Sequence, residues 1–136
     1  MLNSFARSRA RTVYLRGGAD SALDRAGTFS LSGPVNAFTI WPPEAVRITR
    51  GAENIGSYQK TENTIRKWCS ACGGHLLSEH PLWGVTDVAA AVLPGLPFKA
   101  ALHVNYASTV LPMRDGLPKQ KDFPAEMGGS GELLPE

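Results

Sequence analysis

From position 35 onward, the apolar residues of this chain form short runs separated by turn residues. This pattern is typical of the strands of a small β domain. Residues 35–41 form the first run, and two prolines end it. Residues 45–49 then alternate apolar and polar side chains, which is the period of a half-buried strand. We therefore expect two strands in this part of the chain.

A hairpin is predicted next, because two β-favouring runs flank a short polar turn. The runs are residues 55–60 and 64–68, and the turn is Thr61, Glu62 and Asn63. Further strands are expected at 75–79, 85–92 and 102–106. Together these runs predict a mainly β fold.

The two ends of the chain differ in composition from its middle. Residues 1–33 are rich in Arg, Ser and Ala and lack the apolar segment of a secretory signal. We interpret them as an irregular, poorly ordered arm, and an organellar transit peptide is a second interpretation. Residues 124–136 hold several Gly and Pro residues, which disfavour regular structure. The domain proper is predicted at 34–123, followed by an irregular tail at 124–136.

Composition narrows the classes of function. A chain of 136 residues fits one domain, and its formal charge of +2 is too small to indicate binding to nucleic acid or to a membrane surface. No apolar run approaches the roughly 20 residues of a membrane-spanning helix. Two cysteines three positions apart cannot link distant parts of a fold, which excludes a secreted disulfide scaffold. We therefore expect a cytoplasmic protein.

The clearest chemical motif is the pair Cys69 and Cys72, which is followed directly by Gly73. Two residues between the thiolates let both sulfurs bind one tetrahedral zinc ion at about 2.3 Å. The glycine permits a positive φ, which brings backbone amides toward the sulfurs. The motif therefore predicts that Cys69 and Cys72 are metal ligands, with zinc as the metal.

Two other interpretations of the pair remain open. A redox dithiol is one, because Trp68 precedes the pair as in thioredoxin-like sites. Such a site continues into a helix, whereas Gly73 and Gly74 disfavour a helix here. The second interpretation is a pair of small buried side chains without a ligand.

A structural zinc ion takes four protein ligands, and this chain offers only two thiolates. In one hypothesis, His75 and His80, which follow the cysteines closely in sequence, complete a Cys-Cys-His-His ligand set. His103 from another strand is a further candidate. In the alternative hypothesis, a second subunit supplies the missing ligands.

Several segments together carry a family resemblance. Residues 36–42 read NAFTIWP, residues 46–51 read VRITRG, residues 57–58 read SY and residues 67–76 read KWCSACGGHL. Residues 111–119 read LPMRDGLPK. In this order the segments resemble the GFA/CENP-V family, whose members are glutathione-dependent formaldehyde-activating enzymes and their relatives.

The resemblance implies a small β-rich, zinc-ribbon-like domain and a carbon-sulfur lyase activity that joins formaldehyde and glutathione. Cys69 and Cys72 match the family's downstream pair of structural zinc ligands. Its upstream Cys-x-Cys pair and its catalytic Cys-x-Cys-x-x-Cys cluster belong before residue 34, where this sequence has no cysteine. We hypothesise that residues 1–33 are not the ancestral segment, as after a shifted reading frame or a misplaced start.

Two functional hypotheses follow, and neither assigns a catalytic residue. The first is a zinc-dependent lyase of the S-(hydroxymethyl)glutathione synthase type, with glutathione as its small thiol partner. The second is a non-catalytic metal-binding or interaction domain that shares zinc across a homodimer. The missing cysteines favour the second. The remaining polar candidates are expected to be solvated charges; they are Glu53, Glu62, Asp87, Arg114 and Asp115.

Overall fold

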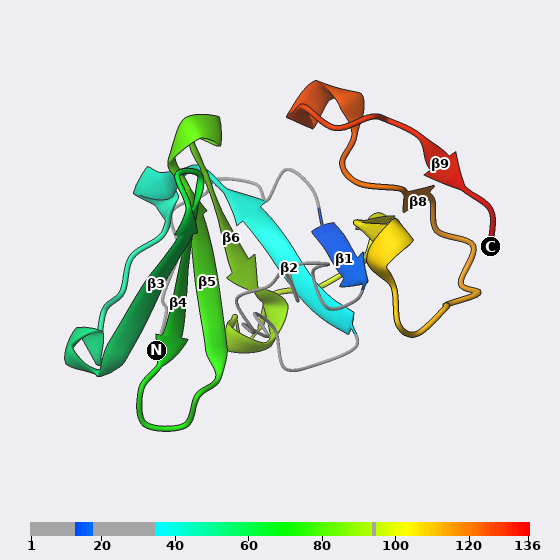
Figure 1. Cartoon of the computed structure of the whole chain (residues 1–136). Coiled ribbons are helices and arrows are strands. Elements are labelled where there is room, and N and C mark those ends of the chain that lie inside the picture. Colours follow the sequence, from blue (N-terminus) through cyan, green and yellow to red (C-terminus); the bar gives the residue numbers. More distant parts are fainter. Residues whose placement is uncertain (1–12, 18–34, 94) are drawn as a thin grey trace. The chain divides into compact units, whose positions relative to one another are not determined.

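The computed structural model describes residues 13–17, 35–93 and 95–136, and these residues are mainly β (Figure 1). Their only helices are 3-10 turns of three residues each. The predicted fold class is therefore confirmed. The described residues fall into two compact units, one of 38–93 and 95–98 and the other of 13–17, 35–37 and 99–136. Apart from residues 13–17, the predicted N-terminal arm lies outside the described residues.

The first unit is built on an antiparallel sheet in the order β3-β4-β5-β6-β2. Figure 1 shows β3, β4 and β5 side by side in green. The strand bounds are β2 Val35–Trp41, β3 Ile55–Thr61, β4 Thr64–Cys69, β5 His75–His80 and β6 Val85–Ala89.

Most strands of this unit lie where the sequence predicts them. The strand at 35–41, the hairpin of β3 and β4, and the strand beginning at residue 75 are confirmed. The strand predicted at 85–92 ends at Ala89, where the 3-10 turn η4 (Ala90–Val92) begins.

The strand predicted at 45–49 is wrong. Ala45 is instead the last residue of the 3-10 turn η1 (Pro43–Ala45), and Ile48 is the one residue of 45–49 that forms a β-bridge. Pro43 accounts for the start of the turn, because its fixed φ suits the first residue of a helical turn. A second turn, η2 (Ala52–Asn54), leads from this segment into β3.

The core of the first unit centres on Trp41, Leu77 and Val88, with Val46, Leu76 and Val92 among the partly buried residues packed against it. The indole N–H of Trp41 donates to the hydroxyl of Thr39 at 2.6 Å, and that hydroxyl donates to the carbonyl of Val88 at 3.3 Å. The indole nitrogen of Trp41 and the hydroxyl of Thr39 are thus both paired, which avoids their desolvation cost.

The second unit contains β1 (Val13–Gly17), β7 (Leu102–Val104), β8 (Lys119–Gln120) and β9 (Leu133–Leu134). β7 is parallel to both β1 and β8, and β8 is antiparallel to β9. The strand predicted at 102–106 ends at Val104. Asn105 then takes a left-handed φ of 52° and leads into the turn η5 (Tyr106–Ser108).

The tail at 124–136 contains the turn η6 (Ala125–Met127) as well as β9. The predicted bounds of the domain at 34–123 stay a prediction. Among the described residues, no helix is long and apolar enough to cross a membrane.

Candidate metal centre

Cys69 and Cys72 lie in a tight reversal between β4, which ends at Cys69, and β5, which begins at His75. The amide of Gly73 donates to the carbonyl of Cys69 at 2.7 Å, and the amide of Cys69 donates to the carbonyl of Gly74 at 2.9 Å. Gly73 has a φ of 75°, a value that glycine adopts at little cost. The reversal that the motif predicts after the hairpin is therefore present.

The sulfur of Cys69 receives hydrogen bonds from its own turn. The amide of Cys72 is the strongest influence and lowers the pKa of Cys69, and the amide of Ala71 and the thiol of Cys72 lower it further. Burial acts in the opposite direction but has less effect. Each donor stabilises the thiolate more than the thiol. The Cys72 thiol thus also favours the thiolate form of Cys69.

The turn is anchored to the residue that precedes β3. The amide of Ser70 donates to the carbonyl of Asn54 at 2.8 Å, and the hydroxyl of Ser70 donates to the same oxygen at 3.0 Å. Ile55, the next residue, pairs with Cys69 in the hairpin register. The position of the first sulfur is thus fixed by the hairpin as well as by its own turn.

Both cysteines are free thiols, and both are accessible. Cys69 is half-buried, and Cys72 is exposed. Within residues 13–17, 35–93 and 95–136, no group of three or more His, Cys, Asp or Glu residues is placed to hold a metal ion. The described part of one chain therefore offers an ion two sulfurs at this turn.

The candidate histidine ligands have other partners. His75 lies 3.5 Å from the hydroxyl of Ser78 through its Nε2 atom. His80 donates from Nδ1 to the carbonyl of Asn63 at 2.9 Å. In the second unit, Nε2 of His103 lies 2.7 Å from a carboxylate oxygen of Asp115. The ligand sets proposed from these histidines stay predictions.

Asp87 is not the solvated charge that the sequence predicts. Asp87 is only 7% exposed. Its carboxylate accepts a hydrogen bond of 2.8 Å from the amide of Ser78 and lies 3.1 Å from Nε2 of His80. The register explains the burial, because Asp87 lies opposite Ser78 in the pairing of β5 with β6. A carboxylate at this depth is tolerated because it is hydrogen-bonded.

A cavity of about 520 Å³ adjoins the cysteine turn, and Cys69 is one of its lining residues. Its other lining residues are Ile48, Arg50, Gly51, Asn54, Ile55, Leu76, Leu77, Ala91 and Val92. A smaller cavity of about 320 Å³ lies beside His80 and shares Ile48 and Leu77 with the first. Both cavities lie within the first unit.

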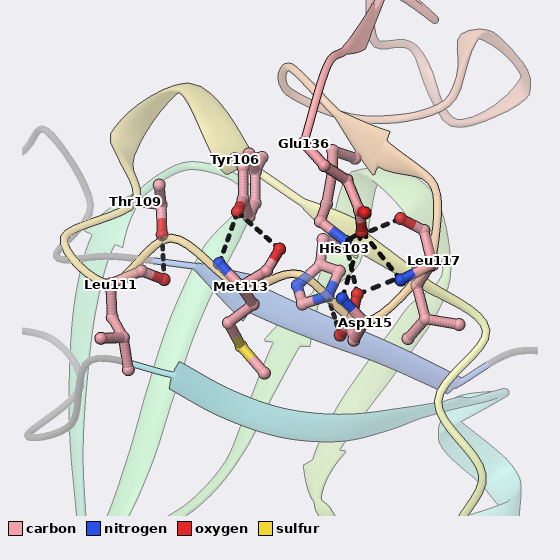
Figure 2. A network of polar contacts seen from close by, with 10 residues as sticks. His103, Tyr106, Thr109, Leu111, Met113, Asp115, Leu117 and Glu136 are labelled. Carbon is pink, nitrogen blue, oxygen red and sulfur yellow. Dashed lines mark hydrogen bonds and ion pairs between the residues drawn. The ribbon is translucent and has the colours of Figure 1, made fainter.

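The second unit holds a polar network that no sequence motif predicts (Figure 2). The ammonium group of Lys119 contacts the carboxylate of Asp115, the carboxylate of Glu136 at 2.8 Å and the carbonyl of Leu117 at 2.8 Å. The Lys119 side chain is 1% exposed, whereas that of Asp115 is 26% exposed. His103, which is fully buried, contacts the second oxygen of Asp115.

The charges of this network determine its pKa values. Burial tends to raise the pKa of Asp115, but hydrogen bonds from Lys119 and His103 hold it well below the ordinary value. Burial tends to lower the pKa of Lys119, but its bonds to Asp115 and Glu136 raise it overall. The pKa of Glu136 is lowered by Lys119 first and then by the amide of Gly116. The network is thus a set of mutually stabilised ions.

No side chain of this network belongs to a motif that indicates burial. Asp115 and Lys119 both lie in the segment 111–119, whose Pro and Gly residues are typical of an exposed loop. A signal was present only in their spacing, because an acid and a base four positions apart can pair across a turn.

No protein-family model and no curated protein sequence matches this chain.

Proposed function

We propose that this chain is a zinc-binding domain in which Cys69 and Cys72 supply two of the four ligands of a structural site. The observation that supports this proposal is the geometry of the turn. Two free thiols lie in one tight reversal between β4 and β5, and backbone amides of that turn stabilise the first as a thiolate. Zinc binds cysteine in its deprotonated form, so these donors favour the state that a metal ion requires.

In this proposal, a second copy of the chain supplies the other two zinc ligands. A Cys₄ site is a common structural zinc centre, and a two-fold axis through the ion places two sulfurs from each subunit around it. Cys72 is exposed, so a partner can approach the turn. We place the protein in the cytoplasm, where thiols are kept reduced. The resemblance to the GFA/CENP-V family also supports a structural zinc at this pair.

The zinc content and the mass of the purified chain test the proposal together. We expect about half a zinc ion per chain and a dimer, because a four-ligand ion divides between two chains with two ligands each. Cys72→Ser removes a ligand and should abolish both the zinc and the dimer. His75→Asn is the matched control, because it removes a nearby donor and should leave zinc content unchanged.

Two outcomes would reject the shared site. One zinc ion per monomer that is lost in His75→Asn would show a local Cys-Cys-His set instead. A metal-free chain that takes up no added zinc would show that the turn is not a metal site at all.

A carbon-sulfur lyase acting on glutathione-aldehyde adducts is the second candidate. It rests on the family resemblance alone, because the thiolate that adds to the aldehyde in this reaction is that of glutathione and not that of Cys69. A turnover assay with glutathione and formaldehyde tests it. The rate must exceed that of the uncatalysed reaction and must fall in Cys69→Ser for this candidate to stand.

A further inference from the structure

The cavity beside Cys69 has the size and the walls of a small-molecule site. Its volume of about 520 Å³ lies within the range of roughly 300 to 1,000 Å³ that ligand pockets occupy. Leu77, which is 2% exposed and belongs to the core of the first unit, forms part of the wall. Leu76 and Val92, which pack against that core, line the same space. The cavity therefore opens directly onto the hydrophobic core.

One cation lies among these apolar walls. Arg50 lines the cavity, and no hydrogen bond or ion pair joins its side chain to another residue of the described ranges. Gly51 follows it with a φ of 73° and turns the chain, so that Asn54 also lines the cavity. The only other polar side chain of the wall is the thiol of Cys69. Arg50 is thus the one charged residue among those that line the cavity.

We propose that this cavity binds a small amphiphile with an apolar body and a single carboxylate head. The body packs against Ile48, Leu76 and Val92, and the carboxylate pairs with the guanidinium of Arg50. A carboxylate suits this position because the planar guanidinium can donate two parallel hydrogen bonds to it. An apolar body suits the rest because it replaces water against side chains that cannot hydrogen-bond.

This binding site shares Cys69 with the proposed zinc site but does not include Cys72. A ligand in the cavity would therefore cover one sulfur of the turn and leave the other accessible. Removing Cys72 should abolish zinc binding without changing the affinity for the carboxylate, so the two proposals can fail separately.

Titration of the full chain with decanoate, followed by calorimetry, tests the proposal. We expect saturable binding, with an affinity about tenfold weaker in Arg50→Gln. This loss is at the low end of the range for a charge-assisted hydrogen bond, because Arg50 is exposed and solvent screens its charge. Arg47→Gln is the matched control: it removes the same charge from an exposed arginine that does not line the cavity, and it should bind as the wild type does. Decanol, with the same tail and no charge, should bind more weakly and should not respond to Arg50→Gln.

A second measurement locates the ligand. Decanoate should slow alkylation of Cys69 by iodoacetamide but not that of Cys72, as resolved by peptide mass spectrometry on the chelator-treated chain. Ala91→Glu, which introduces a carboxylate at an exposed lining position, should abolish both the binding and the protection. The proposal is overturned by the absence of saturable binding, by equal losses in Arg47→Gln and Arg50→Gln, or by equal protection of both thiols.

Discussion

The amide of Gly73 donates a hydrogen bond of 2.7 Å to the carbonyl of Cys69. This bond closes the turn that holds the two sulfurs, and the left-handed φ of Gly73 then directs the chain so that the carbonyl of Gly74 accepts the amide of Cys69 at 2.9 Å. The geometry of the proposed zinc site therefore depends on a residue that cannot itself bind metal.

Gly73→Ala should loosen this turn. An alanine at a φ of 75° costs about 1 to 2 kcal/mol, because its Cβ approaches the neighbouring carbonyl oxygen. We expect a lower free energy of unfolding in urea and a weaker affinity for zinc in a chelator competition. Gly74→Ala is the control, because its new Cβ would meet only the Cys72 sulfur, at an ordinary 3.5 Å. Equal effects of the two substitutions would contradict the role of Gly73.

The hairpin below the turn depends on a contact between a glycine and an aromatic ring. A Cβ added to Gly56 would lie 2.5 Å from the indole of Trp68, its partner in the register of β3 and β4. Gly56→Ala should therefore destabilise the first unit by about 1 to 3 kcal/mol, the usual cost of overpacking. Denaturant unfolding measures this loss. In a Trp68→Leu background the same change should cost much less, and an additive double mutant would disprove the contact.

The strands of the first unit could be predicted from the sequence because their residues alternate or are β-branched and their turns are polar. The segment 45–49 also alternates, but two prolines precede it and begin a 3-10 turn. In this case the local geometry of Pro43 outweighs the pattern of the residues that follow. The order of the strands does not follow from such patterns, because it depends on pairing between distant residues such as Trp41 and Thr86.

In the candidate site too, features that depend on neighbouring residues could be predicted, whereas features that depend on distant residues could not. The turn around Cys69 could be predicted, because spacing and a following glycine are local features. The cavity could not, because Arg50 and Val92 are distant in sequence and meet only after the sheet has formed. The burial of Lys119 was also missed. Lysine is almost never buried without a partner, and its partner Glu136 lies in the tail that was predicted to be irregular.

Lys119 should be far more important for stability than its exposed neighbour Lys121. Lys119→Met leaves the carboxylates of Asp115 and Glu136 without their shared cation, and because both carboxylates are partly exposed the loss should be about 1 to 3 kcal/mol, the cost of leaving hydrogen-bonding partners unsatisfied. Lys121 pairs with Glu132 at 2.7 Å, but both side chains are about half exposed. Lys121→Met should therefore cost much less, because solvent screens an exposed ion pair. Thermal unfolding of both variants measures the difference, and similar losses would show that the Lys119 network contributes little.

Acid should destabilise the network of Lys119, Asp115 and Glu136, because two of its members are carboxylates that become protonated at low pH. The pKa values of Asp115 and Glu136 are lowered from their ordinary 3.8 and 4.5. Their contribution to stability is therefore complete above those ordinary values and is lost as the pH falls through the lowered ones. Lys119 has a raised pKa, so its contribution stays complete in acid and declines only as the pH rises above 10.5 through the raised value.

The free energy of unfolding between pH 7 and pH 2 measures this dependence. The wild type should lose stability as the pH falls below about 4.5, and Asp122, whose pKa is lowered chiefly by hydrogen bonds from Ser130, should add to the loss. Asp115→Asn cannot titrate at this position, so its stability should decline less steeply with acid even though it starts lower. The substitution also removes a partner of Lys119 and so lowers the stability at every pH. For this reason the measurement compares how steeply the free energy of unfolding falls with pH, and not its absolute value. Parallel curves for the two proteins would show that Asp115 titrates alike in the folded and unfolded chain, which would contradict the network of mutually stabilised ions.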